Sequence, residues 1–136
     1  MAKTPVTLYV DGFKEREVAA VSYQFTQAID KEGQTTGIPR GGKIIIKVKA
    51  MNDGNCELLS WMCDKSLAKS GKLEYMSSAD AAKKMKDVEF KDAYCVEFLE
   101  HWEDTTKAGD LAHWELITIS CKEITNQTVT YENEWS

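Results

Sequence analysis

The stretch KIIIKVK at residues 43–49 carries the pattern that recurs along this chain. Ile44, Ile46 and Val48 fall on one side of an extended backbone, and Ile45 falls on the other side with the lysines. A period of two residues predicts a half-buried β-strand. Because Ile45 places a bulky apolar side chain on the second face, one core does not use all the apolar surface of this strand.

Two further alternating segments precede this strand. Residues 6–10 (VTLYV) and 21–25 (VSYQF) alternate in the same way, and Asp11 and Gly12 supply a turn after the first segment. The three features together predict an antiparallel hairpin. Residues 18–21 (VAAV) break the alternation by one position, which predicts a β-bulge in the second strand.

Residues 27–42, between the hairpin and the strand at 43–49, are polar and rich in glycine. They predict a long protruding loop, and loops of this length without structure of their own are often functional. Arg40, Gly41 and Gly42 resemble a phosphate-binding turn, but they precede a strand, so no helix N-terminus is present to meet an anion. The glycines are expected to permit special backbone angles or the close approach of another chain.

The second half of the chain continues the β pattern after one helix. Apolar residues at helical spacing predict a short amphipathic helix over 56–67 that ends near Gly71. Strands are predicted over 73–76, 85–104 and 111–123, with a weaker signal around Val129 and Tyr131 in the tail. The predicted core face of the longest strand holds Val88, Phe90, Tyr94, Val96 and Phe98.

This order of elements predicts a mainly β fold. We expect a small antiparallel β-barrel, built as two packed sheets, with one flanking α-helix and a long protruding loop. The chain has 136 residues, of which 43% are hydrophobic and 29% charged, which suits one core and a single domain over residues 1–136.

The charge and the N-terminal segment narrow the possible partners and compartments. The net charge is -5 and the lysines are dispersed, so the positive stripe that binds phosphates is missing and no nucleic acid is expected. No apolar run is long enough to span a bilayer, so we expect no membrane insertion. The start of the chain has no Sec-type signal peptide, so we expect the chain to fold in the cytoplasm.

The cysteines and histidines do not form a recognisable site in the sequence. Cys56 and Cys63 lie two helical turns apart, roughly 10 Å, so they cannot share a metal ion or a disulfide. All four cysteines are expected to be buried small hydrophobes, and His101 and His113 are expected to form a cross-strand pair on the surface. We therefore expect no catalytic residue, no metal and no cofactor; a Cys–His enzyme centred on Cys95 or Cys121 ranks as the third hypothesis.

Surplus apolar surface is the more informative feature. Several strands carry bulky side chains on both faces, and aromatic residues gather near the loops and the tail. Such surface favours self-association. Two alternatives stay open: the surplus lines a two-sheet core, or the chain is a monomeric barrel that binds a small apolar ligand.

Several strings, in this order and spacing, resemble a divergent branch of the Hcp (TssD) family, the tube proteins of type VI secretion systems. They span nearly the whole chain. The strings are Asp30 with Gly33 and Arg40-Gly41-Gly42, Leu59 with Trp61-Met62-Cys63-Asp64, Met85-Lys86 with residues 90–96, Glu115-Leu116 with Ile117 and Ile119, and Glu132-Asn133 with Trp135.

The resemblance implies a structural, non-enzymatic role. It implies a barrel protomer, a hexameric ring, and rings that stack into a hollow tube propelled by a contractile sheath. It also implies a spike protein as partner, effectors carried or chaperoned in the lumen into target cells, and secretion without a Sec signal. The loop would reach a neighbouring subunit or ring. The candidate interface residues are Asp30, Gly33, Arg40, Gly41, Gly42 and Trp135.

Overall fold

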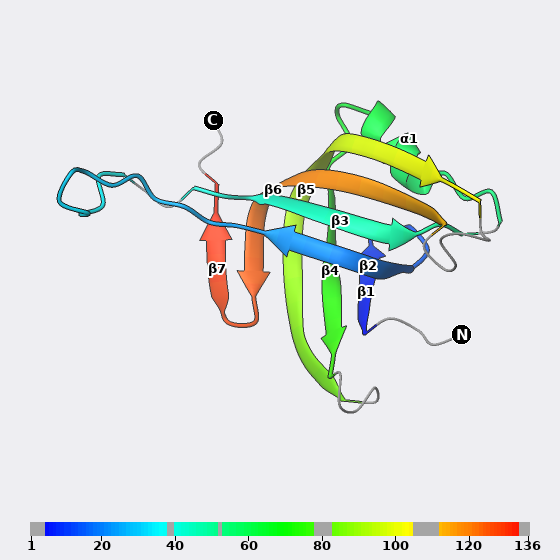
Figure 1. Cartoon of the computed structure of the whole chain (residues 1–136), viewed down its shortest axis with the longest axis horizontal. Helices are drawn as coiled ribbons and strands as arrows, with labels where there is room; N and C mark the ends of the chain where they lie inside the picture. The colour runs from blue at the N-terminus through cyan, green and yellow to red at the C-terminus, as the bar shows by residue number, and fades with distance from the viewer. Residues whose placement is uncertain (1–4, 38–39, 52, 78–82, 105–111, 134–136) are drawn as a thin grey trace.

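The computed structural model describes residues 5–37, 40–51, 53–77, 83–104 and 112–133. Within these residues the fold has seven antiparallel strands and one short helix (Figure 1). In chain order they are β1 (Val6–Val10), β2 (Arg16–Tyr23), β3 (Lys43–Lys49), α1 (Glu57–Cys63), β4 (Lys69–Met76), β5 (Lys84–Trp102), β6 (His113–Asn126) and β7 (Val129–Glu132). The mainly β prediction is confirmed. No helix of the described part is long and apolar enough to cross a membrane.

The strands form one sheet that closes on itself. Its order is β3-β2-β1-β4-β5-β6, and β3 also pairs with β6, so six strands make a barrel and β7 is an added strand. Because β5 occupies one edge of β6, β3 and β7 share its other edge, end to end. The changeover falls where Cys121 N donates to Gly42 O and Asn133 N donates to Lys122 O. The start of β3 and the end of β7 therefore meet.

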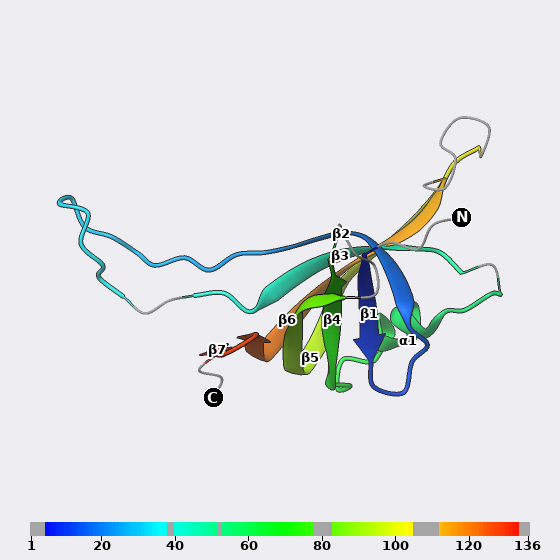
Figure 2. The same cartoon turned by 90° about the horizontal axis from the view of Figure 1, so that it is seen from below.

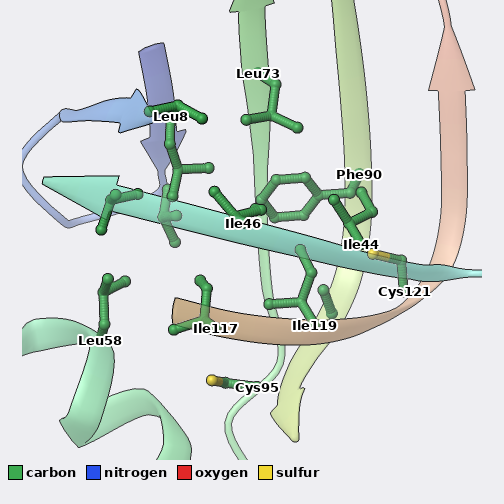
Figure 3. Packing of buried hydrophobic residues seen from close by; sticks show 14 of the residues in the cluster. Leu8, Ile44, Ile46, Leu58, Leu73, Phe90, Cys95, Ile117, Ile119 and Cys121 are labelled. Carbon is green, nitrogen blue, oxygen red and sulfur yellow. The ribbon is translucent and has the colours of Figure 1, made fainter. Parts of the chain in front are cut away.

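The barrel interior is filled by the side chains that the alternation predicted. Ile44, Ile46 and Val48 are 0% exposed, whereas Ile45 on the opposite face is 44% exposed. Figure 3 shows Ile44 and Ile46 close to Ile117, Ile119, Phe90 and Leu73, which come from the strands around the barrel. The bulge predicted in the second strand is also present, as a register shift between Val18 and Ala20.

The helix is shorter than predicted, and its expected end at Gly71 is wrong. Asp64 is extended, and its Oδ1 accepts hydrogen bonds from the backbone N and the Oγ of Ser66, which turns the chain away from the helix. Gly71 lies within β4, opposite Val10 and Phe90. A Cβ on Gly71 would come within 2.1 Å of the Tyr9 carbonyl oxygen, so close strand packing explains this glycine.

The predicted core face of β5 is wrong in its middle. Val88 and Phe90 are buried, but Asp92 has a φ of 50° and the side chains that face the core after it are Ala93 and Cys95. Val96 is 40% exposed, and Tyr94 is only half-buried. A residue with positive φ shifts the alternation by one position, which a strict period of two cannot anticipate.

Candidate functional site

The most distinctive part of the molecule is the segment between β2 and β3, residues 24–42, which we call the arm. Figures 1 and 2 show it projecting far from the barrel. It is a two-stranded ribbon rather than an irregular loop: Thr26 and Arg40 exchange both backbone hydrogen bonds, at 2.8 and 2.6 Å, and Thr36 N donates to Ala28 O. All side chains from 24 to 37 are exposed, including the apolar Ile29. The arm is thus an ordered projection that its own barrel does not cover.

Asp30 and Gly33, two of the predicted interface residues, build the tip of the arm. Asp30 Oδ1 accepts hydrogen bonds from the backbone N of Glu32 and of Gln34, both at 3.0 Å, and Gly33 N donates to Asp30 O at 3.1 Å. Gly33 has a φ of +83°, a conformation in which glycine is favoured. Their local role is to fix the turn, and contact with another subunit stays a prediction for both.

Gly41 and Gly42 lie at the root of the arm, against the end of β7. Gly41 N donates to Tyr131 Oη at 3.0 Å, and Gly42 has a φ of +99°. Asn133 Nδ2 donates to Cys121 O at 2.8 Å and to Gly41 O at 3.3 Å. The structure therefore gives these glycines a role within the chain: Gly42 adopts a special backbone angle and leaves room for Asn133, and Gly41 leaves room for the Phe25 ring.

The two remaining predicted interface residues are Arg40 and Trp135. Arg40 is exposed, and its backbone closes the ribbon against Thr26. Trp135 lies outside the described residues. Sequence reasoning did not connect Tyr131 with Gly41, although Tyr131 stood out as an aromatic residue of the tail. Position in the sequence carries no sign of a contact between residues that far apart.

The outer face of the barrel carries a second candidate surface. Ile45 on β3 and Leu99 on β5 are exposed, and the strand between them, β6, contributes Leu116 opposite Leu99 and Thr118 opposite Ile45. Leu99 and Leu116 thus lie side by side away from the core, with Ile45 on the same face, whereas Thr118 is polar and only 6% exposed. Apolar patches of this kind on a small domain mark interaction surfaces.

The cysteines divide into two classes, so the expectation of four buried thiols is wrong for half of them. Cys56 and Cys63 are exposed at the two ends of α1, where the helix turns only one face to the barrel. Cys95 and Cys121 are buried in the core cluster. Burial raises the pKa of Cys95 to about 11 and the pKa of Cys121 to about 12. Both buried thiols therefore stay protonated near neutral pH, which makes them poor nucleophiles.

Thiol reactivity should reflect this division. Because the thiolate is the reacting form, a raised pKa protects Cys95 and Cys121 at pH 8, while Cys56 and Cys63 are accessible. We expect Ellman's reagent to modify two thiols per chain rapidly in native protein and all four in denaturant. A Cys56→Ser/Cys63→Ser variant should lose the rapid phase. Rapid reaction of a third thiol would contradict the buried placement.

The two histidines do not form the predicted cross-strand pair. His101 lies opposite Trp114 and His113 lies opposite Trp102, so the two imidazoles are on different faces of the β5–β6 ribbon. His113 Nε2 lies 2.8 Å from a carboxylate oxygen of Glu100, and the His101 ring stacks on Trp114 at 4.8 Å. In the part of the chain that the structure describes, no three potential metal ligands cluster.

A closed six-strand barrel with one short helix and a projecting arm makes this chain a small β-barrel protein. The family model for hemolysin coregulated protein Hcp (TssD) matches residues 2–136. The chain therefore belongs to the Hcp (TssD) family, the tube-forming proteins of type VI secretion, which is a structural family and not an enzyme family. Among curated protein sequences, none matches the chain.

Solved structures agree with this assignment. Hcp1 from Flavobacterium johnsoniae is similar with a TM-score of 0.83 and 27% identity, over 94% of this chain and 98% of that one. Hcp1 from the E. coli EAEC 042 pathovar is similar with a TM-score of 0.72 and 15% identity, over 98% of this chain and 99% of that one. A chain of the sheath-tube complex of PVC, an extracellular contractile injection system, is similar with a TM-score of 0.59 and 16% identity, over 95% of this chain and 92% of that one. The last two likenesses concern the fold alone.

Proposed function

We propose that this chain is the repeating subunit of a type VI secretion tube, in which six copies form a ring and rings stack into a hollow tube. The observation that carries the proposal is the arm: an ordered ribbon whose side chains from 24 to 37 all face solvent. Ordering a chain segment costs conformational entropy, and the barrel gains little buried surface from this one, chiefly the contact of Phe25 with Tyr23 and Tyr131. A second copy is the occupant that such a projection suits, and family membership supports it.

The barrel surface supports the same proposal. The exposed apolar side chains of β3 and β5, together with the outer edge of β7, are features that a neighbouring subunit would cover. A head-to-tail contact closes into a ring when its rotation closes, and it leaves identical surfaces for stacking. The described residues that fill the barrel interior, among them Ile46, Phe90 and Ile117, speak against the alternative of a ligand bound inside the barrel.

The further partners belong to the same proposal. The likeness to a sheath-tube complex supports association with a contractile sheath. A spike protein at the tip of the tube and effectors carried or chaperoned in its lumen complete the proposed machine, which delivers them into target cells. We propose that the chain folds in the cytoplasm and leaves the cell through the tube machinery itself, since the family is secreted by type VI systems.

Shortening the arm tests the proposal directly. Thr26 and Arg40 already pair, so residues 27–39 can be replaced by an Asn-Gly turn without disturbing the strands on either side. We expect the native chain to sediment as rings or tubes and the shortened chain to form no tubes, with the same circular dichroism and, at concentrations where both are monomeric, the same melting temperature. Negative-stain images show the particles. A native chain that stays monomeric over a wide concentration range would contradict the proposed ring, and tubes of the shortened chain would contradict the role of the arm.

A further inference from the structure

The root of the arm is tied to the end of the C-terminal strand by a chain of hydrogen bonds. Gly41 N donates to Tyr131 Oη, and Tyr131 Oη donates to Asn133 Oδ1 at 2.8 Å. Asn133 Nδ2 then donates to Gly41 O and to Cys121 O. Three side-chain polar groups and two backbone carbonyls thus satisfy one another at a single point. We call Tyr131, Asn133, Phe25, Gly41 and Gly42 together the clasp.

Both strands of the arm are held at this point. On the outgoing strand, the Phe25 ring packs on the Tyr131 ring with centroids 4.8 Å apart. On the returning strand, a Cβ on Gly41 would lie 2.3 Å from an atom of the Phe25 ring, and a Cβ on Gly42 would lie 2.0 Å from Asn133 Nδ2. Only glycines fit these two places without displacing the side chains that grip them.

Because the clasp lies at the root of the arm, a small change at the clasp causes a large displacement of the tip. The ribbon is held together internally by the Thr26–Arg40 and Ala28–Thr36 hydrogen bonds, which do not involve the barrel. At 3.3 Å per residue, the seven steps from Thr26 to Gly33 span roughly 23 Å. A rotation of about 10° at the root therefore moves the tip by about 4 Å, which is more than a hydrogen bond or a packed contact tolerates.

We propose that the C-terminal strand positions the arm: Tyr131 and Asn133 fix its direction, so that the arm meets its neighbour only while β7 is in place. The proposal rests on the proposed function, since it takes a second copy as the partner of the arm. Tyr131 and Asn133 are positioning residues, because they act through Gly41 and Phe25 on a segment that extends away from both. The barrel core does not depend on them, since β7 is added outside the closed ring of six strands.

Removing a single hydroxyl tests the clasp. Tyr131→Phe keeps the ring that packs on Phe25 and removes the oxygen that bonds both Gly41 N and Asn133 Oδ1. We expect hydrogen exchange of the Gly41 amide to quicken by roughly three- to tenfold, the effect of about one net hydrogen bond. The amides of β3 and β6 in the barrel should exchange as in the native chain. The protein concentration at half-assembly should rise by a similar factor, measured by sedimentation velocity.

Two further variants make the test specific. Asn133→Asp keeps the shape of the side chain but places a carboxylate oxygen against the carbonyls of Gly41 and Cys121, so it should loosen the arm more than Tyr131→Phe does. Tyr9→Phe on β1 removes a phenolic oxygen whose neighbours are Glu15 and Glu74 rather than the clasp, and it should change neither measurement.

The outcomes distinguish failure of the clasp proposal from failure of the proposed tube function. Unchanged exchange at Gly41 in both clasp variants would overturn the proposal, and so would faster exchange with unchanged assembly. If the native chain itself stays monomeric, the proposed tube function fails, whereas exchange at Gly41 in isolated protomers still decides whether β7 holds the arm.

Discussion

Replacing Glu115 by alanine should lower the free energy of unfolding by roughly 3–5 kcal/mol, since it leaves a buried guanidinium without its counter-charge. Glu115 on β6 and Arg16 on β2 are each only 4% exposed, and they form an ion pair inside the protein. The same Arg16 Nη2 donates to the carbonyl oxygen of Lys49 on β3 at 2.9 Å. The pair thus joins three strands at one end of the barrel. Urea unfolding followed by circular dichroism measures the change.

Two further variants test whether burial of the Arg16–Glu115 ion pair explains the loss of stability. Glu100 lies opposite Glu115 in the β5–β6 pairing, but it is exposed and its partner His113 is at the surface, so Glu100→Ala should cost less than about 1 kcal/mol. An Arg16→Met/Glu115→Leu double variant, which removes both charges, should recover most of the loss. Equal effects of Glu115→Ala and Glu100→Ala would contradict the account.

Replacing Trp61 by alanine should destabilise the fold by a similar amount, about 3–5 kcal/mol. Trp61 is 0% exposed and, together with Leu58, it anchors α1 on the barrel. Its ring meets the Phe13 ring edge-on at 6.1 Å, and its Nε1 donates to the carbonyl oxygen of Leu67 at 3.0 Å. Alanine would leave a cavity and an unpaired carbonyl, and a helix of two turns has little stability of its own.

A residue on the same helix provides the control for this experiment. Leu59 is 42% exposed, so Leu59→Ala should change the free energy of unfolding by less than about 1 kcal/mol. Trp61→Phe keeps much of the packing but loses the hydrogen bond to Leu67, and it should fall between the two. If Trp61→Ala melted within a few degrees of the native chain, the helix would not depend on this anchor.

Much of the fold could be predicted because most strands obey a simple alternation. The strand at 43–49, the first strand of the hairpin and the strand that holds Ile117, Ile119 and Cys121 have their core faces where the pattern placed them, whereas β2 ends at Tyr23 and leaves the predicted strand residue Phe25 exposed in the arm. In each of these strands one face meets the core and the other does not, so apolar residues occupy every second position.

The errors arose where another contact overrode the local pattern. Gly71 follows a helical segment, as many helix ends do, but it is a glycine because β1 passes too close for a side chain. Asp92, with its positive φ, moved the core face of β5 to Ala93 and Cys95, and the register shift between Cys95 and Glu97 returns Phe98 to the core. Cys56 and Cys63 are apolar enough to suggest burial, yet α1 is short and turns them outward. The cause at Gly71 is a contact distant in sequence, whereas the φ of Asp92 and the turn at Asp64 are local features that a simple periodicity does not include.

The candidate site was predicted in its position but not in its construction. Glycines and polar residues marked residues 27–42 as a projection, and Asp30, Gly33, Gly41 and Gly42 do shape it. The clasp could not be found, because it joins Gly41 to Tyr131 across the closure of the barrel. The interface roles of all six candidate residues, Trp135 included, stay predictions for the assembly experiments.

The pairing that closes the barrel has a consequence for biosynthesis. Lys43–Lys49 pairs with residues 114–120, so β3 must wait for its partner while the ribosome adds about 70 more residues, roughly 4–14 s at ordinary elongation rates. During that interval the nascent chain exposes Ile44, Ile46 and an unpaired strand edge, the combination that promotes aggregation. We therefore expect slower translation of the last third of the message to reduce the yield of soluble protein, and a chaperone that shields nascent hairpins to restore it.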